Sequence, residues 1–344
     1  MASVAEADFL VGTRGLVRDL GAWVLAAEFG RDGRSLFYAL ADGRVAVVEP
    51  REAEADWTFC DVGAALLSAT ADVAAGLMAG TDDGRLLQVS PQGAVSVLAR
   101  YGSRWIDHVA AHPSGVRAAA VGKLLHLLDG KGAALKTLPA HPSSVGGIAF
   151  DTKGKRVAAS HYGGVSLWYV AAREDKPRSL PWKGSHQAVL FDPSGEHVVT
   201  AMQEASLHGW RLSDGQHMRM SGYPGKTRSM AFTGRGRWLA TSGAESIVLW
   251  PFFAGGPMGK APTELAGGDA VLCSAVACHP EHEVVAAGFE DGLVLLAEIT
   301  SGKVVPVAPP RGSAVTSLAW NATGTHLAFG TEAGFCGVVD LSKR

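Results

Sequence analysis

The sequence has little cysteine, and the few cysteines form no framework. Four occur in 344 residues, at Cys60, Cys273, Cys278 and Cys336. Small secreted domains that are held together by disulfides carry many cysteines at regular spacings, so this class is disfavoured. A protein of a reducing compartment, the cytoplasm, is the simplest expectation.

Long apolar runs and a strong charge of one sign are also missing. No run reaches the roughly 18 apolar residues that a membrane helix needs. The start, MASVAEAD, has no basic stretch followed by an apolar core, which is the pattern of a secretory signal. The formal net charge of −2 gives no reason to expect bulk attraction to nucleic acid or anionic lipid. We therefore expect a soluble protein that binds no membrane, and a nucleic-acid partner is disfavoured.

Glycine, in contrast, is abundant, with 43 residues, and it separates short apolar runs. The stretch 141–170, HPSSVGGIAFDTKGKRVAASHYGGVSLWYV, contains a first run at 145–150, a turn with Gly154, a second run at 157–160 and a third after a Gly-Gly turn. Short β-type runs separated by glycine turns predict an antiparallel meander.

This unit recurs along the whole chain. Gly33 and Gly324, the turn glycines of the first and last copies, are 291 positions apart, which is seven steps of about 42 residues. A meander cannot bury both of its faces alone, so it must stack on copies of itself. The eight copies lie near residues 24–48, 66–89, 109–128, 145–168, 189–210, 229–250, 276–296 and 318–339.

A period of about 42 residues lies in the range of four-stranded propeller blades, and the chain resembles the WD-repeat β-propeller family over nearly all of its length. In that family a His before the first strand, a Ser or Thr on the second, an Asp in the next turn and a Trp on the third form a hydrogen-bonded set. Trp168, Trp210 and Trp250 occupy the last of these positions and are expected to lie in the core. The nearest approach to a full set is His186, Thr200, Glu204 and Trp210.

These observations predict an all-β fold. We expect a single β-propeller domain over residues 1–344, with eight blades of four antiparallel strands and seven blades as the alternative. The last repeat ends near Leu341 without a fourth strand of its own. Residues 9–17 are predicted to form one short strand that completes this last blade and closes the ring, which would remove exposed sheet edges.

Three predicted loops between blades each join an aromatic side chain to a cation, and a turn of the fourth repeat lies on the same predicted face. Aromatic residues and arginine are frequent hot spots because they bury a large area and donate fixed hydrogen bonds, and the cations favour an acidic partner. The alternative is that Trp105 and Trp182 pack between blades while the cations are solvated. The candidate partner-binding residues are Tyr101, Arg104, Trp105, His161, Tyr162, Trp182, Lys183, Tyr223, Lys226 and Arg228.

No metal, cofactor or catalytic site is predicted. Cys273, Cys278, His279 and His282 are close in sequence, but the two cysteines are five positions apart and point to opposite faces of one strand. His279 occupies the same turn position as Asp151, where a polar side chain can bond the turn backbone. Tetrahedral metal sites need converging ligands. Scattered Ser, His and Asp residues form no assembled triad.

The WD-repeat resemblance implies a platform for protein complexes. We therefore predict a non-catalytic scaffold that binds a partner protein or peptide on its loop face, an inference that rests on fold resemblance. One alternative is an enzyme with a site at the central opening, although the strand starts there, such as Val145, Cys273 and Val315, are apolar. The other alternative is binding of single-stranded nucleic acid through the aromatic and basic loops, which the slightly acidic balance disfavours.

Overall fold

The computed structural model describes residues 9–50, 55–267 and 270–342. Within those residues the secondary structure is one five-residue helix, α1 (Leu10–Arg14), and thirty β-strands. No helix in this part of the chain is long and apolar enough to cross a membrane. The prediction of an all-β fold is therefore confirmed.

The chain divides into two compact units. One consists of the described residues in Met1–Phe29, Gly33–Thr58 and Thr227–Arg344, and the other of Gly30–Asp32 and Phe59–Lys226. The single domain that we expected over residues 1–344 stays a prediction.

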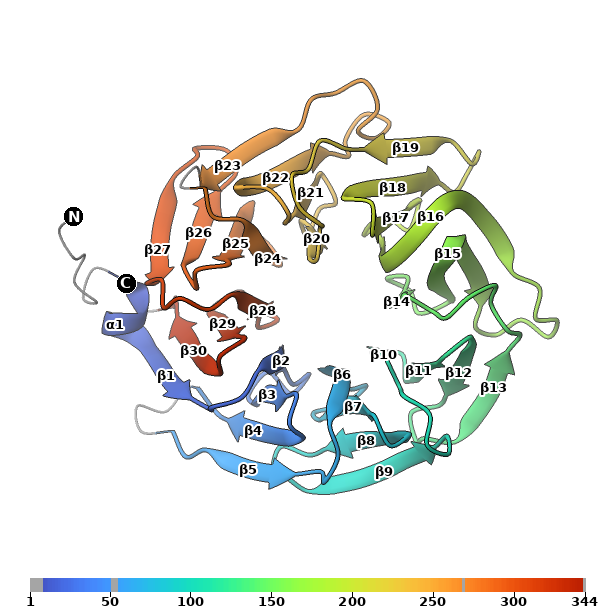
Figure 1. Cartoon of the computed structure of the whole chain (residues 1–344), viewed down its shortest axis with the longest axis horizontal. Helices are drawn as coiled ribbons and strands as arrows, with labels where there is room; N and C mark the ends of the chain where they lie inside the picture. Colours follow the sequence, from blue (N-terminus) through green and yellow to red (C-terminus); the bar gives the residue numbers. More distant parts are fainter. Residues whose placement is uncertain (1–8, 51–54, 268–269, 343–344) are drawn as a thin grey trace. The chain divides into compact units, whose positions relative to one another are not determined.

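The first unit contains four antiparallel sheets (Figure 1). In three of them the strands lie in chain order, and the fourth sheet begins with the N-terminal strand. The division between the units falls inside β5. The sheets are β2 (Val24–Phe29), β3 (Leu36–Leu40), β4 (Arg44–Val48) and β5 (Thr58–Asp61); β20 (Met230–Phe232), β21 (Trp238–Thr241), β22 (Ser246–Pro251) and β23 (Thr263–Gly267); β24 (Cys273–Cys278), β25 (Val284–Phe289), β26 (Val294–Glu298) and β27 (Val304–Ala308); and β1 (Gly15–Asp19), β30 (Phe335–Asp340), β29 (His326–Thr331) and β28 (Val315–Trp320).

The second unit contains three antiparallel sheets, two of four strands and one of six. They are β6 (Leu66–Ala71), β7 (Leu77–Thr81), β8 (Arg85–Val89) and β9 (Val95–Arg100); β10 (His108–His112), β11 (Val116–Val121), β12 (Leu124–Leu128) and β13 (Ala134–Leu138); and β14 (Gly147–Phe150), β15 (Arg156–Tyr169), β16 (Arg178–Phe191), β17 (His197–Met202), β18 (Ser206–Arg211) and β19 (His217–Met220).

The second strand of a repeat is the most completely buried. Every residue of β3, β11 and β17 is buried, on both faces of the strand. Such strands lose the alternation of apolar and polar residues and become short runs of small and apolar residues, such as the VRAAAV of β11. The outer strands are more exposed, as in β5 and β9, and in β19 exposed and buried residues alternate.

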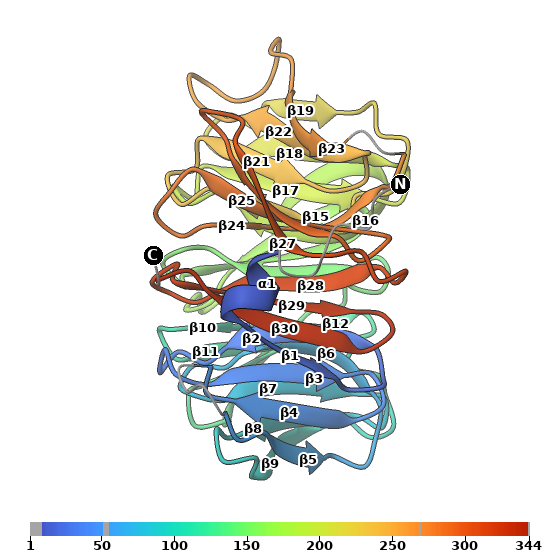
Figure 2. The ribbon, with the colours of Figure 1, turned by 90° about the vertical axis from the view of Figure 1, so that its left-hand side faces the viewer.

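The N-terminal strand pairs as predicted but with different bounds. Strand β1 lies antiparallel to β30, with Gly15 opposite Val339, so it is the fourth strand of the sheet formed by the last repeat. Residues 10–14, which we expected in the strand, form α1 instead, next to β27 and β30 (Figure 2). The helix allows both Phe9 and Val11 to be buried in the apolar cluster around Val307 and Leu327.

The described residues form seven sheets, which is the number that we gave as the alternative, whereas we preferred eight. The difference arises in the six-stranded sheet, which contains the predicted repeats at 145–168 and 189–210. There, β15 contains the second and third strands that we assigned to the repeat at 145–168, and β16, also 14 residues long, continues into the first strand of the next repeat. The sequence pattern gave no sign that β16 pairs with β15 through its first half and with β17 through its second half.

Two histidines, His279 and His112, bond neighbouring turns, and the first of them was considered above as a metal ligand. In the first unit, Nδ1 of His279 accepts hydrogen bonds from the backbone N–H groups of Glu281 and His282, at 3.1 and 3.0 Å. Its Nε2 therefore carries the proton and donates to the carbonyl of Gly324, at 3.1 Å. His112 in the second unit contacts its own turn and the carbonyl of Thr152 in the same way. Each histidine thus ties one repeat to the next.

Replacing Gly324 by alanine is expected to destabilise the protein more than the same change at Gly33. Both glycines have positive φ, 68° and 67°. A Cβ at position 324 would lie 2.1 Å from Nε2 of His279, whereas one at position 33 would have no atom within 4 Å. Backbone strain costs about 1 kcal/mol in each variant, and the displaced histidine adds roughly 1 kcal/mol at Gly324. Urea unfolding of both variants measures this difference, and equal losses would contradict the role of His279.

Candidate functional site

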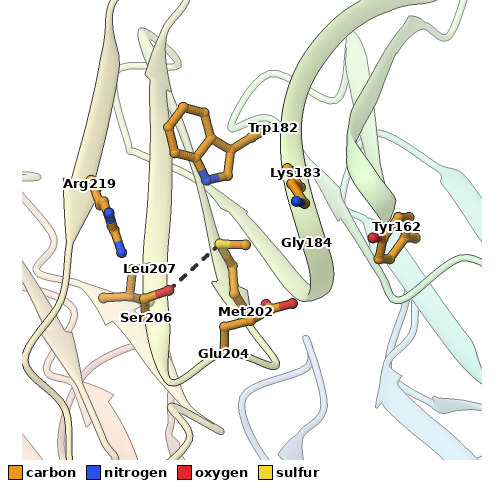
Figure 3. A pocket seen from close by; sticks show the side chains of 9 residues that line it. All are labelled: Tyr162, Trp182, Lys183, Gly184, Met202, Glu204, Ser206, Leu207 and Arg219. Carbon is orange, nitrogen blue, oxygen red and sulfur yellow. Dashed lines mark hydrogen bonds between the residues drawn. The ribbon is translucent and has the colours of Figure 1, made fainter.

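Three of the ten candidate residues lie together in the second unit. Tyr162, Trp182 and Lys183 line one pocket of about 340 Å³. Figure 3 shows its other lining side chains, which come from β17, β18, β19 and the turn between β17 and β18. The sequence did not indicate these residues, which are Met202, Glu204, Ser206, Leu207 and Arg219, with Gly184 at the backbone.

The indole ring of Trp182 is fixed by stacking. It lies parallel to the ring of His208, with centroids 3.8 Å apart and 13° between the planes. Nε2 of His208 lies within hydrogen-bond distance of Nδ1 of His217, at 2.9 Å. Burial, followed by the positive charges of neighbouring groups, lowers the pKa of His208 to about 3, so this ring is neutral near pH 7. Trp182 therefore rests on an uncharged aromatic support.

The single carboxylate of the pocket is already used. Oε1 of Glu204 accepts a hydrogen bond from the backbone N–H of Ser185, at 3.1 Å. Gly184, with φ of 126°, allows this close approach, since a Cβ there would lie 2.4 Å from the terminal methyl of Met202. The Ser206 hydroxyl contacts the Met202 sulfur, at 3.8 Å (Figure 3). These contacts fix the apolar floor of the pocket.

The two cations of the pocket, unlike its carboxylate, are not used in polar contacts within the described part of the chain. Lys183 and Arg219 are exposed, and within residues 9–50, 55–267 and 270–342 their side chains make no ion pair or hydrogen bond. Tyr162 exposes 58% of its surface beside them. The pocket thus combines aromatic and apolar surface with two cations that lack a partner. This combination suits a ligand that carries an apolar and an acidic group.

The candidates of the first loop are not part of this pocket. Tyr101 packs on His126, with ring centroids 4.3 Å apart, and burial raises the pKa of its hydroxyl to about 12. Arg104 is exposed, and Trp105 exposes 62% of its surface. Trp105 is therefore mostly exposed to solvent, whereas Trp182 is half-buried.

The other candidates are dispersed. His161 is buried and bonds the carbonyl of Tyr162 and the hydroxyl of Ser166, at 2.9 and 3.1 Å, so its role is structural and it does not face a partner. Lys226 is exposed and Tyr223 is half-buried, and neither lines the pocket. Arg228 lines a different pocket, in the first unit. The ten residues therefore do not form one site.

The hydrogen-bonded set of the resemblance is formed only in part. Nδ1 of His186 lies 2.7 Å from the Thr200 hydroxyl, but Glu204 bonds the backbone of Ser185 instead of completing the set. In the preceding repeat, Nε1 of Trp168 donates to His141, at 3.2 Å. Trp168, Trp210 and Trp250 are all buried, as the core role predicted for them requires.

Repeated four-stranded antiparallel meanders with glycine turns define the class of β-propellers. Two family models match parts of the chain: "Anaphase-promoting complex subunit 4 WD40 domain" over residues 276–344 and "WD domain, G-beta repeat" over residues 132–169. Together with the fold, these matches support the resemblance to the WD-repeat β-propeller family.

Two further comparisons found similar proteins. The chain is 25% identical over 188 residues to mouse "Telomerase protein component 1", an alignment that covers 52% of this chain but only 7% of that protein. The crystal structure of the computationally designed protein Ika8 superposes with a TM-score of 0.76 at 17% sequence identity, covering 94% of this chain and 98% of the other. At this identity the second likeness concerns the fold alone.

Proposed function

We propose that the protein is a non-catalytic scaffold that binds an acidic segment of a partner protein in the pocket between Tyr162, Trp182 and Arg219. WD40 propellers are generally protein-interaction scaffolds and typically not enzymes. The observation that carries the proposal is the pair of cations, Lys183 and Arg219, next to a stacked tryptophan. A carboxylate of the partner would pair with the cations while an apolar side chain contacts Met202 and the indole.

The stacking of Trp182 favours binding for an entropic reason. A ring that is already held on His208 loses little rotational freedom when a partner covers it, and preorganisation of this kind reduces the cost of association. Glu204 supports the same view, because its hydrogen bond to Ser185 leaves the cations available to an incoming carboxylate. The pocket therefore requires little rearrangement before it accepts a ligand.

Changing Lys183 and Arg219 together to alanine is expected to weaken partner binding at least about tenfold, because two charge-assisted contacts are lost. Affinity purification with the wild-type protein would identify the partner, and titration calorimetry with the purified partner would give the dissociation constants. Lys226→Ala is the matched control, since it removes an exposed cation of the same unit outside the pocket. If the double variant bound the partner as tightly as Lys226→Ala, the proposed pocket would be wrong.

We also infer that the six-stranded sheet corresponds to two blades, which gives eight repeats in the chain. Residues 157–160 of β15 pair with β14, whereas its residues 162–167 pair with β16. In the same way, residues 178–185 of β16 pair with β15, and residues 186–191 pair with β17. A crystal structure in which β16 keeps one pairing partner throughout, without the change between Ser185 and His186, would contradict this division.

A further inference from the structure

A second pocket lies wholly in the first unit. Its volume is about 510 Å³, and it is formed by the beginnings of β2, β24 and β28, the segment before β20 and the turn after β29. The residues that matter for its chemistry are Trp23, Arg228, Ser274, Thr316 and Glu332. Trp23 exposes 47% of its surface, so a broad aromatic face is available there.

The hydroxyl groups of this pocket are occupied by the fold. Ser274 donates to the carbonyl of Val315, at 2.7 Å, and Thr316 donates to the carbonyl of Val24, at 2.6 Å. These bonds join neighbouring first strands of the unit. Recognition of a ligand therefore depends on the charged side chains and the indole, not on free hydroxyl donors.

The charged side chains enter from different segments. The turn that contains Glu332 is held against the segment before Trp23, because the backbone N–H of Leu20 donates to the carbonyl of Gly334, at 2.9 Å. Glu332 and Trp23 thus come from neighbouring segments, while Arg228 precedes β20. Among the described residues, neither the Glu332 carboxylate nor the Arg228 guanidinium has an ion pair or a side-chain hydrogen bond.

We propose that this pocket binds a basic side chain, a lysine or arginine of a partner segment. An indole face and a carboxylate together are the pair that stabilises an alkylammonium or guanidinium ion, the first through its quadrupole and the second through its charge. Arg228 repels an isolated cation and attracts an acidic group beside it. The site is independent of the pocket around Trp182 and prefers the opposite charge.

The test uses N-acetyl-lysine methylamide as a probe and N-acetyl-norleucine methylamide as its uncharged control, with binding followed by NMR titration of the intact protein. The lysine probe is expected to bind at least tenfold more tightly than the norleucine probe. Glu332→Gln should abolish this preference, and Trp23→Leu should weaken binding of the lysine probe. Arg228→Gln should strengthen that binding about twofold or more, because it removes a like charge at an exposed position.

Glu332→Gln is expected to weaken binding of the lysine probe and Arg228→Gln to strengthen it. Simple damage to the pocket would instead weaken binding in both variants, so the opposite effects identify charge recognition. Equal affinities for the two probes, or an unchanged affinity in Glu332→Gln, would overturn the proposal. Lys183→Ala should leave binding of the lysine probe unchanged because Lys183 belongs to the other pocket. The two proposals can therefore fail separately.

Discussion

Replacing Arg117 by alanine is expected to lower the free energy of unfolding by about 3–5 kcal/mol, because it leaves a buried carboxylate without its cation. The Arg117 guanidinium binds Asp72 through two parallel bonds, Nε to Oδ1 at 2.6 Å and Nη2 to Oδ2 at 2.8 Å. The two side chains are 2% and 0% exposed. Burial alone would raise the pKa of Asp72, but the hydrogen bonds and charge of Arg117, with hydrogen bonds from the Val73 backbone and Gln88, outweigh it and lower that pKa, so the carboxylate is ionised near pH 7.

Urea unfolding measures this loss, and two variants interpret it. Arg211→Ala removes an arginine from a pair with Asp214 that is 30% and 50% exposed, and it should cost much less than Arg117→Ala because solvent screens an exposed pair. Adding Asp72→Asn to Arg117→Ala should restore part of the stability, since it removes the unpaired charge. Equal losses of unfolding free energy in Arg117→Ala and Arg211→Ala would show that the buried pair contributes no more to stability than the exposed pair.

This ion pair also shows what a repeat pattern can and cannot predict. The period of about 42 residues located the strands of most repeats, and it placed Trp168 and Trp210 in the core correctly. Arg117 stands alone among small apolar residues in β11, which was a signal for a buried charge. The sequence could not identify its partner Asp72, 45 positions earlier, because it does not distinguish this residue from other acidic residues about one repeat away.

The candidate pocket was predicted in part for a similar reason. Trp182 and Lys183 were identified because they form an aromatic and cationic pair in one loop. Arg219 was missed because it lies on β19, a four-residue outer strand with no glycine or aromatic marker. His161 was misjudged, since a turn residue next to glycines was expected to be exposed, whereas it is buried against Ser166.

Acidification from pH 7 to pH 5 is expected to lower the free energy of unfolding by roughly 2–4 kcal/mol, since several buried histidines bind protons only after unfolding. His141, His186 and His208 are at most 3% exposed, and burial is the largest cause that lowers the pKa of each. A histidine with a lowered pKa in the folded state contributes stability above its unfolded pKa of about 6.5, and this contribution is lost as the pH falls. Each such group can change the stability by up to about 1.4 kcal/mol per pH unit.

Urea unfolding at pH 7, 6 and 5 checks the sign and the slope. His208→Phe keeps an aromatic surface beneath Trp182 and removes the histidine whose pKa is lowered to about 3. Between pH 6 and pH 5 this variant should take up close to one proton fewer on unfolding, so its free energy of unfolding should fall less steeply with pH than that of the wild type. Constant or rising stability between pH 7 and pH 5 would contradict the expectation. Binding at the Trp182 pocket needs the folded second unit. Partner affinity of the wild type should therefore fall with pH only where the unfolded state becomes populated. This dependence on unfolding distinguishes loss of the fold from the loss of affinity expected when Lys183 and Arg219 are removed.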